Sequence, residues 1–199
     1  MNALEKKRIK ATFKYTWPFY LIVAVLIPLL FHFVFGIAHR TPAYKTLTLF
    51  VSGEISDQKT LESDMKERFK EKDIKSFSCI SANPGDGNYN TKLTIAGYNT
   101  ADVLILPLSK LDDVVVSAFG KELTAEMIDT YYASFSLYKQ DEINYGIKLD
   151  KEKVNKYMSL PSEDCYMVLN GKSSNLGKYS KEENSDHDMA LQLVKDWGI

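Results

Sequence analysis

The stretch DVLILP, residues 102–107, decides the fold class of this 199-residue chain. Its compact run of apolar residues predicts a strand that is buried on both faces, as in a parallel sheet. Residues 45–51 predict an earlier strand that Gly53 ends, and residues 74–80 alternate as another. Helical patterns separate these strands, so we expect parallel pairing with right-handed crossovers. The sequence predicts an α/β domain with a mainly parallel sheet.

Helix signals lie between and after these strands. Ser56 or Asp57 is suited to cap a helix whose Leu61, Met65 and Phe69 repeat at i, i+4 and i+8. The remaining predicted elements are helices at 90–96, 108–119 and 124–131, strands at 134–138, 145–149 and 165–169, and helical turns within 151–157. The last of these strands return as antiparallel partners in our interpretation.

The C-terminal part combines a polar stretch with an amphipathic helix. Residues 170–184 are rich in Gly, Ser and Lys, which predicts an exposed loop. Ser185 is expected to cap the last helix, with Asp188 completing a pattern like a capping box. The helix carries a stripe at i, i+3, i+4 and i+7 that is expected to face the core: Ala190, Leu193, Val194 and Trp197.

Residues 17–38 contain no Asp, Glu, Lys or Arg. As a helix this run is about 33 Å long, enough to cross a hydrocarbon layer of about 30 Å. Five basic residues precede it, between Lys6 and Lys14, and fewer follow it. The positive-inside rule then puts the N-terminus in the cytoplasm and the C-terminal domain outside the membrane. The expected parts are a cytoplasmic basic segment (1–16), a membrane helix (17–38), a short stalk (39–44) and an extracytoplasmic domain (45–199).

Two other interpretations of the apolar run stay open. Gly36-Ile37-Ala38 has the small-x-small form of a signal-peptide cleavage site, but the run exceeds the roughly 7–15 residues of a signal core. A buried core helix is rarely this long without a charge. We favour an uncleaved anchor in contact with the lipid bilayer.

The formal net charge of −1 is the sum of two unlike parts. Residues 1–40 hold six Lys or Arg and one Glu, a balance of +5, whereas residues 41–199 hold 19 basic and 25 acidic residues, a balance of −6. An acidic domain with scattered lysines does not favour binding to nucleic acid.

No catalytic motif is visible in the sequence. A nucleophile-and-base site in the domain would need His187, but its acidic neighbours favour a solvated helix start. We find no phosphate-binding glycine loop, no calcium-binding loop and too few histidines for a metal site. The sequence therefore predicts neither enzyme activity nor a cofactor.

Cys79 and Cys165 both fall in predicted strands. If these strands were neighbours, a disulfide would close a long loop and stabilise an exported domain. The alternative, which we favour, is a pair of small buried thiols.

Several segments together resemble the first lobe of the extracellular solute-binding proteins of ABC transporters. They are residues 45–53, the helix ending near Phe69, residues 100–107, 145–149 and 166–170, and Ser173 or Ser174 after the last strand. The resemblance implies a single lobe of that fold, on a chain too short for two. It also implies ligand contacts at the carboxyl ends of the strands, where open α/β sheets bind ligands. The residues expected at that edge are Ser52, Glu54, Pro107 and Ser109.

These observations predict a membrane-anchored binding or accessory protein, with a transporter or an envelope protein as its partner. The alternative is a structural or interaction protein of the cell envelope that has no small-molecule ligand. In that case we expect a flat, uncharged strand edge and an exposed apolar patch.

Overall fold

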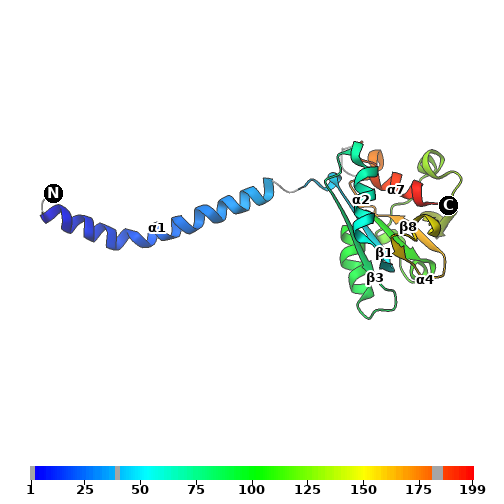
Figure 1. Cartoon of the computed structure of the whole chain (residues 1–199), viewed down its shortest axis with the longest axis horizontal. Coiled ribbons are helices and arrows are strands. Elements are labelled where there is room, and N and C mark those ends of the chain that lie inside the picture. Colours follow the sequence, from blue (N-terminus) through cyan, green and yellow to red (C-terminus); the bar gives the residue numbers. More distant parts are fainter. Residues whose placement is uncertain (1–2, 39–40, 181–185) are drawn as a thin grey trace. The chain divides into compact units, whose positions relative to one another are not determined.

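The computed structural model describes residues 3–38, 41–180 and 186–199, and the chain forms two compact units, Met1–Arg40 and Thr41–Ile199 (Figure 1). The first unit is a single helix, α1 (Ala3–Ala38). Its segment Lys14–Gly36 is long and apolar enough to cross a membrane, and none of it is buried. This exposure argues against a core helix. The expected cleavage site and the start of the stalk reach residues 39 and 40, which lie outside the described residues.

The second unit contains a six-stranded sheet in the order β3-β1-β4-β8-β6-β5. Its strands are β1 (Thr46–Ser52), β3 (Ser76–Ala82), β4 (Val103–Pro107), β5 (Leu137–Gln140), β6 (Ile143–Lys148) and β8 (Cys165–Leu169). Strand β1 lies parallel to β3 and β4, as expected. The pairs β4–β8, β6–β8 and β5–β6 are antiparallel, so the sheet is mixed rather than mainly parallel.

Short elements surround this sheet. A second, two-stranded sheet pairs β2 (Glu54–Ile55) with β7 (Met158–Ser159). The helices are α2 (Gln58–Arg68), α3 (Tyr89–Lys92), α4 (Leu108–Asp112), α5 (Ala125–Met127), α6 (Lys151–Val154) and α7 (Met189–Trp197). Single 3-10 or π turns lie at Ala43–Lys45, Lys70–Lys72, Leu93–Tyr98, Val116–Ala118, Ile128–Tyr132 and Gly177–Tyr179.

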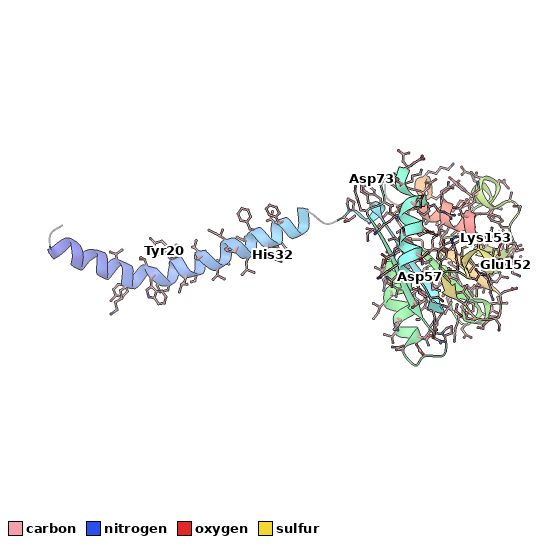
Figure 2. All side chains as sticks on the ribbon, in the orientation of Figure 1. Tyr20, His32, Asp57, Asp73, Glu152 and Lys153 are labelled. Carbon is pink, nitrogen blue, oxygen red and sulfur yellow. The ribbon has the colours of Figure 1, made fainter. Side chains whose placement is uncertain are left out.

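Helix α2 forms as its sequence pattern predicts. Asp57 lies at the start of the helix (Figure 2). Its carboxylate accepts a hydrogen bond from the backbone N–H of Thr60 at 3.0 Å, which satisfies one of the free donors of the first turn. Leu61, Met65 and Phe69 are all buried. The rest of the helix is mostly exposed and charged, so the helix packs on one face only.

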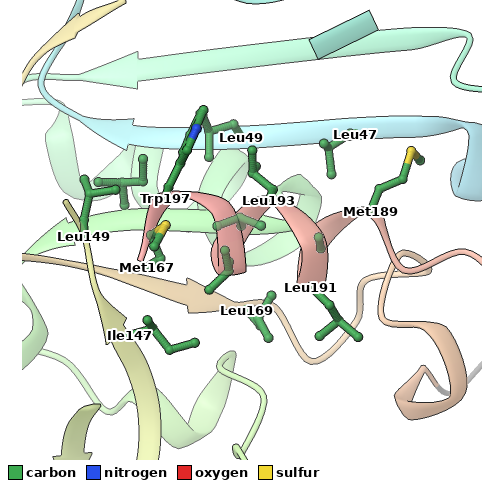
Figure 3. Close-up of a cluster of buried hydrophobic side chains, with 14 of the residues drawn as sticks. Leu47, Leu49, Ile147, Leu149, Met167, Leu169, Met189, Leu191, Leu193 and Trp197 are labelled. Atoms are coloured by element: carbon green, nitrogen blue, oxygen red, sulfur yellow. The ribbon is translucent and has the colours of Figure 1, made fainter. Parts of the chain in front are cut away.

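Apolar clusters cover both faces of the sheet. Leu47, Leu49 and Val51 of β1 point to the larger cluster, and the intervening Phe50 points to the other, as the period of two in a strand requires. Helix α7 packs on the larger cluster, where its side chains lie beside Leu47, Leu49, Met167 and Leu169 (Figure 3). The predicted core stripe of this helix is confirmed, because all four of its members are buried. The predicted cap, Ser185, lies outside the described residues.

The predicted helix over residues 108–119 is wrong beyond Asp112. Residues 114–116 are three consecutive valines, whose branched side chains disfavour a helix. Val115 adopts an extended backbone with φ −84° and ψ 95°. The side chain of Gln140 holds this conformation, since it accepts a hydrogen bond from the N–H of Val116 at 2.8 Å and donates one to the carbonyl of Val114 at 2.9 Å.

The prediction of an exposed loop over residues 170–184 is also wrong for Asn170 and for residues 173–177, which are buried, and its part over residues 181–184 lies outside the described residues. Asp102, itself buried, accepts hydrogen bonds from the Ser173 hydroxyl at 2.5 Å and the Asn175 amide at 3.2 Å. Its other oxygen accepts one from the N–H of Thr48 at 2.7 Å. A polar sequence is therefore buried here because a buried carboxylate pairs with its polar side chains.

A candidate ligand cleft at the carboxyl edge of the sheet

The carboxyl ends of β1, β3 and β4 lie at one edge of the sheet, because these strands run parallel. An open cleft of about 450 Å³ lies at this edge. Its volume falls in the range of small-molecule sites, roughly 300–1,000 Å³. The residues that line it follow β1, follow β3 or belong to β7 and the chain after it: Gly53, Glu54, Asn83, Pro84, Ser159, Leu160 and Pro161.

Gly53 brings two of these segments close together. A Cβ atom at this position would lie 2.4 Å from the backbone oxygen of Ser159 and 3.2 Å from the side chain of Leu160. The N–H of Gly53 also donates to the carbonyl oxygen of Ala82 at 3.0 Å, at the end of β3. The absence of a side chain at Gly53 therefore lets the chain after β1 pack directly against β7 and forms the base of the cleft.

Three polar groups at the cleft have no partner among the described residues. Glu54 lies directly opposite Ser159 in the β2–β7 pair, so the two side chains project to the same side. Neither side chain makes a hydrogen bond or an ion pair within the described parts of the chain. The oxygen of the Asn83 side chain accepts from the N–H of Gly85 at 3.0 Å, which leaves its amide nitrogen free to donate.

One wall of the cleft is formed by the first three residues of the segment 159–164, which we call the strap. The ammonium group of Lys151 donates to the carbonyl oxygens of Pro161 at 2.6 Å and Ser162 at 3.0 Å, and also to that of Glu163. Three acceptors satisfy all three donors of an ammonium group. Hydrogen bonds to a charged group contribute about 1.5–3 kcal/mol each, so this single side chain fixes the course of the strap.

Two further contacts fix the far end of the strap. The backbone N–H and the hydroxyl of Ser109 donate to the carboxylate of Glu163 at 2.9 and 2.7 Å. Lys148 forms an ion pair with Asp164 at 2.7 Å, and this contact raises the pKa of the lysine. The strap is thus attached to β6, α4 and α6 mainly through side chains.

The four residues predicted at this edge have different surroundings. Glu54 lines the cleft. Ser52 is buried, and its hydroxyl lies 2.6 Å from that of Tyr89, whose pKa is raised by burial. Pro107 is buried at the end of β4, opposite Cys165 in β8. Ser109 contacts the strap rather than the open space. The edge is the predicted one, but only Glu54 of the four lines the cleft.

The sequence interpretation missed most of the lining. Asn83 and Pro84 belong to a turn that follows a predicted strand. The strand order therefore predicts that they lie at this edge. Ser159, Leu160 and Pro161 carried no such signal, because they reach the cleft through a two-residue strand that pairs with residues about a hundred positions earlier.

The two cysteines are free and buried. Strands β1 and β4 lie between β3 and β8, so three strand spacings of about 4.8 Å separate Cys79 from Cys165. A disulfide needs Cα atoms within about 7 Å, so the bridge that the sequence left open does not form in this fold. Burial raises the pKa of Cys79 to about 12 and that of Cys165 to about 11, which disfavours the reactive thiolates.

His187, the candidate base of a nucleophilic site, contacts an aromatic ring. Its ring stacks on that of Tyr44 with centroids 4.1 Å apart, which joins the segment before α7 to the turn before β1. Within the described residues, no group of three or more His, Cys, Asp or Glu side chains is placed to hold a metal ion.

The chain matches none of the protein-family models with which it was compared, and no curated protein matches it. Its function therefore has to be inferred from the cleft and from the apolar helix.

Proposed function

We propose that the protein is a single-pass, membrane-anchored binding or accessory protein whose extracytoplasmic domain binds a small solute. The observation that carries this proposal is the cleft at the carboxyl edge of β1 and β3, with three polar groups that lack partners among the described residues. Open α/β sheets bind their ligands at this edge. The resemblance to one lobe of a solute-binding protein leads to the same edge.

The cleft is open, so its own walls bury only part of a ligand. Tight small-molecule sites bury most of the ligand surface. A membrane partner such as a transporter would supply the second wall in this proposal, and the domain would then act as an accessory subunit at the outer face of the membrane.

The proposed orientation rests on the charges beside the apolar helix. Several basic residues precede the segment Lys14–Gly36, and the domain that follows is acidic. Protease added to intact cells should digest the domain and leave the N-terminal segment protected. A domain that stays intact until the cells are permeabilised would contradict this orientation.

Binding is tested on the full chain in detergent micelles by thermal-shift measurements with sugars, amino acids and metal ions. A bound solute raises the melting temperature by mass action. Ser159→Phe places a large side chain at the cleft, opposite Glu54, and should abolish the shift. A shift that persists in this variant would place binding elsewhere.

The alternative role is a structural or interaction protein of the cell envelope without a ligand. It predicts a flat, uncharged edge, whereas the observed edge is concave and carries the Glu54 carboxylate. For this reason we prefer the binding role. The absence of a thermal shift with every class of solute would favour the alternative.

A further inference from the structure

We infer that the solute bound at this cleft carries a positive charge, as an ammonium or guanidinium group on a short apolar body. This inference rests on the proposed binding function and names the ligand class for the same site. It follows from the charge, the free hydrogen-bonding groups and the apolar surface of the cleft.

Among the described residues, Glu54 is the ionisable side chain that lines the cleft, and no described Lys, Arg or His lines it. Three lysines on elements that border this edge of the sheet already have partners. Lys151 donates to three carbonyl oxygens of the strap, and Lys148 is paired with Asp164. Lys110 lies over the ring of Tyr89 and 3.7 Å from the carboxylate of Asp113. An anionic solute would therefore meet a carboxylate without a compensating cation.

Glu54 differs from several other carboxylates of the domain because it has no partner among the described residues. Asp64 accepts from Lys156 at 3.0 Å, Asp73 accepts from Lys75 at 2.7 Å, and Glu163 accepts from Ser109. A carboxylate that faces a cleft without an ion pair is available to a ligand cation. Charge-assisted hydrogen bonds of this kind are roughly twice as strong as those between neutral groups.

Apart from the Asn83 amide nitrogen, which can only donate, the remaining lining agrees with an amine on an apolar chain. The Ser159 hydroxyl, opposite Glu54, offers a second acceptor for the ammonium protons. Pro84, Leu160 and Pro161 provide apolar surface for methylene groups. A divalent metal is a poorer fit, because such ions require several oxygen ligands and a single carboxylate is present here.

Three probes with the same five-carbon chain test the charge of the ligand: 1,5-pentanediamine, 1,5-pentanediol and glutarate. Binding is measured by calorimetry on the full chain in detergent micelles. We expect the diamine to bind about tenfold or more tightly than the diol, and we expect no binding of glutarate. Glu54→Gln should weaken diamine binding by about tenfold or more, and added salt should weaken binding to the unaltered protein.

The matched control is Glu122→Gln, which removes an exposed carboxylate that has no partner among the described residues and lies outside this cleft. It should leave diamine affinity unchanged. Equal diamine affinity in the Glu54→Gln variant would overturn the inference. Binding of the diol or glutarate that equals or exceeds that of the diamine, and that Ser159→Phe abolishes, would overturn the charge assignment and leave the binding function standing. If neither these probes nor the sugars, amino acids and metal ions bind, both proposals fail.

Discussion

Asp102 is 8% exposed and accepts hydrogen bonds from three donors on two separate parts of the chain. It attaches the polar segment around Ser173 and Asn175 to the sheet beside Thr48. Burial raises the pKa of its carboxyl group above the usual 3.8, although the hydrogen bonds oppose this shift. A single carboxylate thus determines where a polar stretch of chain is buried.

We predict that Asp102→Asn lowers the free energy of unfolding by about 1–3 kcal/mol, because the new amide group presents donors to neighbouring donors. Urea denaturation followed by circular dichroism measures this loss. Asp86→Asn, at an exposed position, should change stability little. An unchanged unfolding midpoint in Asp102→Asn would contradict the assigned network.

The loss of unfolding free energy in Asp102→Asn should also depend on pH. Between the unfolded and the raised folded pKa of Asp102, the folded protein holds a proton that the unfolded chain has lost. The pH-dependent part of the Asp102 contribution is therefore fully present below about pH 4, the range of the unfolded carboxyl group, and is lost as pH rises through the folded pKa, whereas the loss from the broken hydrogen bonds applies on both sides. Asparagine does not titrate, so the difference between the two proteins should be largest in acid and shrink with rising pH. A difference that grows with pH would contradict the raised pKa.

At the scale of elements, local pattern explains which parts were predictable. Helices α2 and α7 carry their own periodicity and strand β4 is a continuous apolar run, so their residues specify them without reference to the rest of the chain. The two-residue strands β2 and β7 have no period of their own, and their pairing depends on the close approach at Gly53. The cleft was therefore predicted only on the side that follows β1.

The β5–β6 hairpin turns through two residues in the left-handed backbone region, Asp141 with φ 52° and Glu142 with φ 65°. Such turns favour Asn followed by Gly. We predict that Asp141→Asn combined with Glu142→Gly raises the free energy of unfolding by about 1 kcal/mol, because the strain at φ > 0 is relieved. Glu142→Val should have the opposite effect, since a β-branched residue tolerates this region poorly. Thermal unfolding of the two variants measures both signs, and equal melting temperatures would contradict the prediction.

The strap offers a test of how an element without regular structure is held. Lys151→Met removes the ammonium group that three strap carbonyls accept. We predict that the amides of Leu108 and Ser109, which donate to Asp164 and Glu163 of the strap, exchange with deuterium about tenfold faster or more, because local opening of the strap becomes easier. Lys92→Met, on α3, is the matched control and should leave the exchange of these two amides unchanged. Unaltered exchange in Lys151→Met would show that other contacts hold the strap.

At the scale of the whole molecule, the net charge of −1 describes neither compact unit, because the first unit is basic and the second is acidic. Both apolar clusters lie between Leu47 and Trp197, inside the second unit. We therefore predict that residues 41–199, expressed without the apolar helix, fold and unfold in one cooperative transition. Circular dichroism during heating measures this. A gradual loss of signal without a transition would contradict the independence of the domain.

The position of α7 in the core also has a consequence for the order in which the domain is made. Leu47 and Leu49 are among the first domain residues to be synthesised, and the side chains against which they pack on α7 are among the last (Figure 3). Contacts this distant in sequence form slowly and late. In the proposed orientation, the nascent β1 would therefore lack its α7 contacts until about 140 further residues have crossed. In that orientation, termination at residue 188 should leave a chain that reaches the outer face but stays sensitive to proteases there.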